Sequence, residues 1–151
     1  MDALVHQGGA DINGAHPTEG FTPLILAANV MRPNCLRRLR NVVEHYGADV
    51  NHPGAPSLGG MTALHSAASG STHMPSDPDV SLKAVKYLLS KGADPTLTAD
   101  VMFCDRHQTP RQSMEDERFM GRRGLVPGIR EALLEAEAIF EAQRKLCPKR
   151  G

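Results

Sequence analysis

The densest local cluster of chemically capable side chains is Cys104-Asp105-Arg106-His107. A cysteine and a histidine three positions apart could begin a zinc site, but a structural zinc site takes four ligands and no second pair stands nearby. A Cys–His nucleophile has equally little support, because catalytic partners of this kind meet in the fold and not by adjacency. We therefore expect a hairpin loop here, with no metal and no other cofactor. A small metal or thiol site at Cys104–His107 stays as an alternative.

Composition excludes several classes of function. Lys plus Arg and Asp plus Glu number 17 each, so the formal net charge is zero and gives no broad attraction to nucleic acid. The longest apolar run, Leu24 to Met31, is too short to span a bilayer, and the three widely spaced cysteines fit a reducing compartment. No phosphate-binding glycine loop and no convincing catalytic carboxylate pair is found. We expect a monomeric, non-enzymatic protein that binds neither nucleic acid nor membrane, in the cytoplasm with the nucleus as alternative.

Two short phrases recur in the same order along the chain. The first is Gly9-Ala10-Asp11-Ile12-Asn13, then Gly47-Ala48-Asp49-Val50-Asn51, then Gly92-Ala93-Asp94-Pro95. The second is Gly20-Phe21-Thr22-Pro23-Leu24, then Gly60-Met61-Thr62-Ala63-Leu64, then Gln108-Thr109-Pro110. Gly47 and Gly92 each follow an apolar stripe of helical spacing, where a left-handed residue ends a helix. Each Thr can cap the next helix, so the pattern predicts a repeat of two helices joined by turns.

This unit resembles the ankyrin repeat, in which a Thr-Pro-Leu-His phrase and a Gly-Ala-Asp-Val-Asn phrase occur in phase. The resemblance is strong over about residues 3–95 and weaker beyond. It implies an all-α solenoid of helix-turn-helix units with β-hairpin-like finger loops. We expect one domain over residues 1–151: a partial repeat (1–13), a repeat (14–51), a repeat with an insertion (52–95) and a divergent C-terminal capping repeat (96–147). The resemblance also implies a structural hydrogen bond between His65 and Thr62.

The spacing of the units departs from the family pattern. Thr22 and Thr62 are 40 residues apart and Thr62 and Thr109 are 47 apart, whereas the family period is about 33. Much of the excess falls between the two helices of a unit, in Val30–Asn34 and Ser69–Asp79. Long loops on a rigid scaffold often carry binding, although a tolerated surface insertion is an equally good reading.

The C-terminal part predicts two further helices. One starts at Thr109-Pro110 and continues to about Met120, and the other runs from about Gly128 to Leu146. The apolar residues of the last helix predict one buried stripe, and its charged residues are expected to face water. The stripe is Ile129, Ala132, Leu133, Ala136 and Phe140, and the charged residues are Glu131, Glu135, Glu137, Glu141, Arg144 and Lys145.

A basic run, Arg32, Arg37, Arg38 and Arg40, precedes Gly47. In a neutral chain we interpret it as a solvated outer helix face, with attraction of an acidic partner as the alternative.

The resemblance implies protein–protein recognition without catalysis, through a concave surface of fingers and first helices. Positions just before each Thr are Phe21, Met61 and Gln108, and positions after the paired small residues are Asn29, Val30, Ser69, Glu115 and Asp116. The finger tips add His16, Glu19, Leu58, Met102, Phe103 and Arg106. Because the sequence starts inside a repeat, an ankyrin targeting segment of a larger enzyme or ubiquitin-ligase-type assembly is the alternative.

Overall fold

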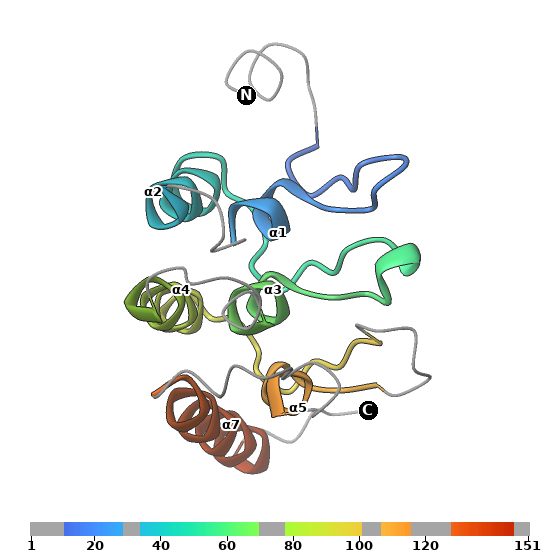
Figure 1. Ribbon diagram of the computed structural model, residues 1–151. Helices are drawn as coiled ribbons and strands as arrows, with labels where there is room; N and C mark the ends of the chain where they lie inside the picture. Colours follow the sequence, from blue (N-terminus) through green and yellow to red (C-terminus); the bar gives the residue numbers. More distant parts are fainter. Residues whose placement is uncertain (1–10, 29–33, 70–77, 101–106, 116–127, 147–151) are drawn as a thin grey trace.

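The computed structural model describes residues 11–28, 34–69, 78–100, 107–115 and 128–146, and within these ranges every regular element is a helix. The helices form three tiers of two (Figure 1). The tiers are α1 (Pro23–Ala27) with α2 (Cys35–Arg40), α3 (Ala63–Ser69) with α4 (Pro78–Ser90), and α5 (Pro110–Glu115) with α7 (Ile129–Leu146). A π-helical turn, η2 (Asn41–His45), continues α2, and a 3-10 turn, η3 (Pro56–Leu58), lies between α2 and α3. The predicted all-α class is confirmed.

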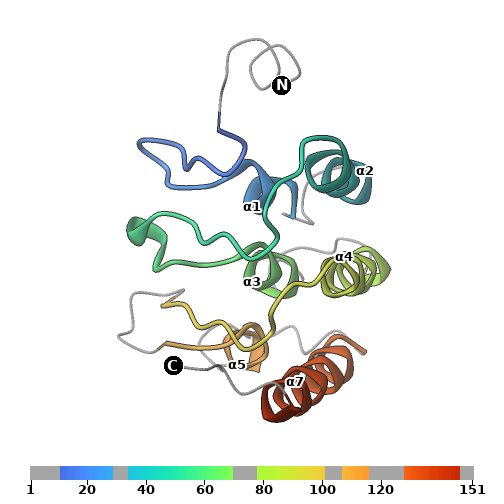
Figure 2. The same ribbon diagram turned by 180° about the vertical axis from the view of Figure 1, so that it is seen from behind.

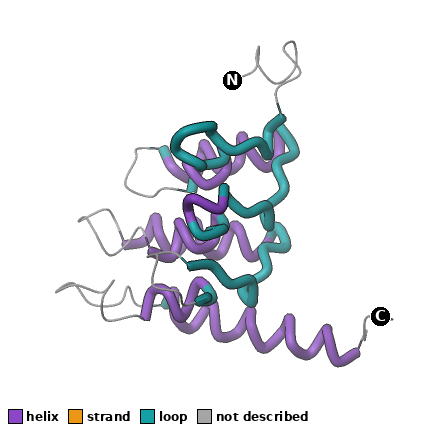
Figure 3. Tube along the Cα trace, turned by 90° about the vertical axis from the view of Figure 1, so that its right-hand side faces the viewer, coloured by secondary structure: helices purple, strands orange, loops and turns teal. Residues whose placement is uncertain are grey.

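The tiers stack so that equivalent helices contact one another. Helices α1, α3 and α5 form an inner layer, and α2, α4 and α7 form an outer layer (Figures 1 and 2). Loops between the tiers project from the inner layer on the side away from the outer helices. Figure 3 views the molecule from that side and shows these loops in front of the helices.

The repeated threonines begin the helices as the sequence predicts. Thr22 caps α1: the Ile25 N–H donates to Thr22 Oγ1 at 3.2 Å, and Pro23 occupies the first helical position. In the third tier the Gln112 N–H donates to Thr109 Oγ1 at 3.3 Å. These bonds satisfy amide groups that a helix start otherwise leaves without partners.

The Gly-Ala-Asp phrase ends one helix and also ties one tier to the next. Gly47 and Gly92 have φ angles of +70° and +91°, the left-handed conformation predicted for them. The Asp94 N–H then donates to Asn51 Oδ1 at 2.7 Å, and the Asp49 N–H donates to Asn13 Oδ1 at 2.8 Å. Each asparagine therefore holds the corresponding turn of the following unit.

One apolar core runs through all three tiers. Leu24, Leu39, Leu64, Leu88 and Leu133 are at most 3% exposed and belong to this core. Alanine pairs at 27–28 and 67–68 are also buried in it, and their small side chains let neighbouring helix backbones approach closely. No tier buries its apolar residues alone, so stability comes from stacking.

Two expectations for the C-terminal part need correction. In α7, Ile129 and Leu133 are fully buried, but Ala132, Ala136 and Phe140 are only half-buried. Helix α7 has 18 residues and its tier partner α5 has six, so the second half of α7 extends beyond the helices it packs against (Figure 3). Glu137, expected in water, is half-buried against Arg111 of α5. The extension of α5 toward Met120 lies outside the described residues.

Candidate partner-binding surface

Three finger loops end beside the starts of the inner helices. In the first finger the His16 N–H donates to the Phe21 carbonyl at 2.8 Å, and in the second the Gly54 N–H donates to the Met61 carbonyl at 2.8 Å. In the third, Ala99 and Gln108 form an antiparallel bridge with two 2.9 Å bonds. Phe21, Met61 and Gln108 therefore close the three hairpins at equivalent positions, one in each tier. We call these three residues the finger-base row.

The fingers are also bonded to each other. The Ala55 N–H donates to the Gly20 carbonyl at 3.0 Å, and the Asp100 N–H donates to the Gly59 carbonyl at 3.0 Å. Gly59 has a φ of +67°, and a Cβ there would collide with the Asp100 backbone. Only glycine permits this close approach. The fingers thus form one connected edge, which fixes the relative positions of the finger-base row.

All three members of the finger-base row are half-buried, as is Leu58 in the second finger. Phe21 and Met61 thus keep part of their apolar surface accessible on a scaffold that fixes their backbone. Gln108 adds an amide group that can donate and accept hydrogen bonds. Partly exposed apolar side chains on a rigid frame are suited to contact another protein.

His16 orders the tip of the first finger. Its Nδ1 atom accepts the Glu19 N–H at 3.2 Å and the Thr18 N–H at 3.4 Å, and it lies 3.1 Å from Thr18 Oγ1. His16 and Glu19 are both exposed. The imidazole therefore holds the tip in shape, while the Glu19 side chain faces solvent.

His65 connects the core of the second tier to the third finger. The imidazole is fully buried. Its Nδ1 atom accepts the Thr62 N–H at 3.3 Å and lies 2.9 Å from Thr62 Oγ1. Its Nε2 atom donates to the Gln108 carbonyl at 2.9 Å. Burial lowers the pKa of His65 from 6.5 to about 4, although the bond to Gln108 acts in the opposite direction. His65 is therefore neutral at pH 7. The bond to Thr62 was expected, whereas the bond to Gln108 was not.

Glu115, predicted to lie on the concave surface, is held in an ion-pair network between α5 and α7. Its carboxylate lies 2.9 Å from Arg111 Nη1 and 2.6 Å from Arg130 Nε, and Arg111 Nε lies 3.0 Å from Glu137. Ser69 is the last residue of α3, in the inner layer. The remaining predicted site residues lie outside the described residues: Asn29, Val30, Met102, Phe103, Arg106 and Asp116.

The described residues give no support to metal or thiol chemistry. They contain no group of three side chains that could hold a metal ion. Cys104 lies outside them, and His107 is exposed. Cys35 is buried in α2, its Sγ lies 3.2 Å from the Ala27 carbonyl, and burial raises the pKa of its thiol above 9.0, which disfavours the reactive thiolate. Within the described ranges no helix has the length and hydropathy needed to cross a membrane.

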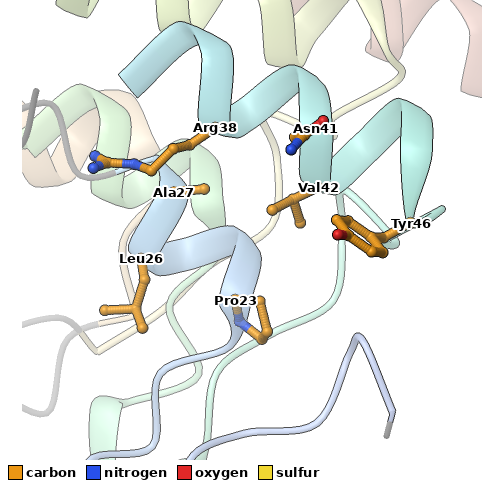
Figure 4. Close-up of a pocket in the computed structure, with 7 residues that line it drawn as sticks. All are labelled: Pro23, Leu26, Ala27, Arg38, Asn41, Val42 and Tyr46. Carbon is orange, nitrogen blue, oxygen red and sulfur yellow. The ribbon is translucent and has the colours of Figure 1, made fainter. Parts of the chain in front are cut away.

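A second feature, not foreseen from the sequence, lies at the N-terminal end of the stack. A hollow of about 280 Å³ opens between α1 and the α2–η2 helix (Figure 4). It is lined by apolar side chains, with one cation and one amide at its edge: Pro23, Leu26, Ala27, Val42 and Tyr46, with Arg38 and Asn41. We call it the end groove. The available signal was a leucine at position 26, where the second unit has Ser66.

Comparison with protein families matches residues 1–99 of the 151 to ankyrin repeats in three copies. A search of curated proteins gives no match. Ankyrin repeats are generally protein–protein interaction modules, and the repeat is a non-catalytic fold. With matching phrases, stacked helix pairs and bonded fingers, this chain belongs to the ankyrin repeat family.

Proposed function

We propose that this chain is a non-catalytic recognition module that holds a segment of a protein partner along its finger-base row. One observation carries the proposal: Phe21, Met61 and Gln108 occupy the same hairpin-closing position in three consecutive tiers. Hydrogen bonds between the fingers fix their separation before any partner arrives. A surface organised in advance loses little conformational entropy on binding, which favours affinity.

The side chains of the finger-base row indicate which chemical groups a partner segment would place against it. Neighbouring helices pack about 8–10 Å apart, so three equivalent positions span roughly 20 Å. A partner segment of that length would place apolar side chains against Phe21 and Met61, and a polar group against Gln108. Glu19, exposed at the first finger tip, adds a negative charge at one end.

The other residues predicted on this side are assigned to the same surface by their place in the repeat. Ser69 ends α3, Asn29, Val30 and Asp116 come after α1 and α5 in sequence, and Met102, Phe103 and Arg106 belong to the third finger in sequence. Of these, Phe103 is the best test residue, because aromatic side chains dominate binding energy at protein interfaces.

Affinity capture from an extract of cells that express the protein tests the proposal. The bait is the whole chain, compared with a triple variant carrying Phe21→Ala, Met61→Ala and Phe103→Ala. A matched control, Phe140→Ala, removes a half-buried aromatic ring from the outer layer. We expect the triple variant to lose at least about tenfold in affinity for the captured partner, while the control binds as the native chain does.

Thermal unfolding by circular dichroism accompanies the capture, so that a folding defect is not mistaken for a binding defect. Equal capture by the native chain and by a folded triple variant would exclude the finger-base row as the binding surface.

A further inference from the structure

The first tier of the solenoid differs from the other two at one repeated position. Four residues after each capping threonine stand Leu26, Ser66 and Ser113. The Ser66 hydroxyl donates to the Ile25 carbonyl of the tier above at 3.3 Å, and Ser113 is fully buried in α5, which packs on α3. Leu26 has no described tier above it and is 37% exposed. The second and third tiers thus carry serine at this position, whereas the first tier carries a leucine, which is apolar and partly exposed.

The end groove beside Leu26 has a basic edge. Its apolar part is formed by Pro23, Ala27, Val42 and Tyr46 together with Leu26 (Figure 4). An adjoining hollow of about 310 Å³ is lined by Asn34, Arg37, Arg38 and Asn41. Arg37 is exposed there. An occupant that fits both parts is apolar in its centre and acidic at its side.

The opposite end of the solenoid carries a surface with these properties. On α7 the residues Leu134, Ala138, Ala142 and Leu146 recur every four positions and are all exposed, on the side of the helix away from buried Leu133. Ile139, beside them, is 56% exposed. We call these five residues the α7 stripe. Glu131 and Glu135 are exposed on the same side, so the stripe is acidic at its N-terminal half.

We propose that the α7 stripe of one copy of this chain seats in the end groove of a second copy. The contact continues the order already present inside the chain, in which α2 packs on α4 and α4 packs on α7. Leu134 and Ile139 supply apolar surface for the groove, the alanines allow close helix approach, and Glu131 and Glu135 face Arg37. The zero net charge of the chain means that no overall repulsion opposes this contact.

Leu26 lies on α1, at the position equivalent to Ser66 of α3, and Ser66 is bonded to α1 of the tier above it. In a stacked pair, α5 of the other copy would take the place above Leu26 that α1 takes above Ser66.

The contact joins two different surfaces and is therefore head-to-tail, which distinguishes it from a two-fold dimer. Sedimentation of the native chain from about 5 to 500 µM covers the range in which weak interfaces dissociate. We expect the average mass to rise above the monomer mass of 16.3 kDa with concentration, and to rise less at high salt, because salt screens the Arg37–glutamate attraction.

Two single variants test the polarity of the contact. Leu26→Glu blocks the groove and leaves the stripe, and Ile139→Glu blocks the stripe and leaves the groove. Each variant alone should associate at least about tenfold more weakly than the native chain, because it buries a charge against apolar surface. In an equimolar mixture, the stripe of Leu26→Glu can still occupy the groove of Ile139→Glu. The mixture should therefore form a species of twice the monomer mass and nothing larger, since this pair leaves no further unblocked groove or stripe.

The control Lys86→Glu places a glutamate at an exposed position of α4, changes the net charge by one unit more than either test variant, and should associate as the native chain does. Circular dichroism checks that all three variants melt as the native chain does. The proposal is overturned if the native chain stays monomeric throughout, which would leave the groove to another occupant, or if the mixture of variants stays monomeric. Undiminished association of either single variant would also overturn it. These outcomes are independent of capture by the finger-base row, which lies on a different face.

Discussion

Acid should destabilise this protein through His65. The folded chain keeps the imidazole neutral down to a pKa of about 4, because burial disfavours its charged form, whereas an unfolded chain protonates it at about 6.5. Between these values the unfolded state binds more protons than the folded state. The stability therefore falls as the pH is lowered from 6.5 to 4, and His65 causes no such loss above pH 6.5.

The size of this effect follows from the width of the window. Each pKa unit of difference corresponds to about 1.4 kcal/mol, so the window from 6.5 to about 4 amounts to about 3 kcal/mol at its lower end. Domains are commonly stable by about 5–15 kcal/mol, so a loss of this size is readily measured. Protonation of Nδ1 would also remove the acceptor for the Thr62 N–H.

The third tier of the same chain provides the control. There the Thr109 N–H donates to Gln112 Oε1 at 3.0 Å, so a glutamine accepts the bond that His65 accepts from Thr62. In His65→Gln we expect a loss of about 1–2 kcal/mol at pH 7, from imperfect replacement of the bond to Gln108. At pH 4 the order should reverse, because the glutamine does not titrate.

Urea unfolding followed by circular dichroism, at intervals from pH 7 to pH 4, measures both chains. Subtracting the variant from the native chain removes the contribution of every other titrating group. If the two free-energy curves run parallel across this window, His65 is not the buried neutral group that the geometry requires, and its link to the third finger loses its support.

Further substitutions separate the contacts that hold the tiers and fingers together, each measured by urea unfolding. Gly59→Ala should cost about 2 kcal/mol more than Gly60→Ala, since both glycines have positive φ but only a Cβ at 59 meets the next finger; equal losses would contradict that close approach. Asn51→Ala should cost more than Asn13→Ala, by about 1 kcal/mol, because among the described residues Asn51 makes two bonds to the next tier and Asn13 makes one; the reverse order would refute this. Arg111→Met should cost about 1–2 kcal/mol, because it leaves the half-buried Glu137 carboxylate of α7 without its ion-pair partner. An unchanged urea midpoint would show that this ion pair does not contribute to stability.

The elements with local causes were predictable from the sequence. A glycine after an apolar stripe and a threonine before proline act within one helix turn, so the ends at Gly47 and Gly92 and the start at Thr22 follow from neighbouring residues. The bond from His65 to Thr62 spans three positions and came from the family resemblance. Predictions of this kind need no knowledge of which tiers touch.

Contacts between tiers were the part that the sequence did not reveal. Asn13 and Asn51 were identified as members of the repeated Gly-Ala-Asp phrase, but their side chains bond to Asp49 and Asp94, 36 and 43 positions further on. The charge of Glu137 indicated solvent, yet Arg111 from another helix partly buries it. For the finger-base row, the sequence indicated equivalent positions and the structure adds the bonds that align them. Binding by that row stays a proposal.

The two proposals meet in the length of the recognition surface. Each tier adds one finger and one position to the row of Phe21, Met61 and Gln108, so three tiers present roughly 20 Å. On the proposed stacking, the Gln108 position of one copy is followed by the Phe21 position of the next, and the row continues across the junction. A partner with one short segment gains nothing from this continuation. A partner with repeated segments would bind at several positions at once and gain affinity through effective concentration. If capture of the partner weakens when the end groove is blocked, the partner is therefore multivalent.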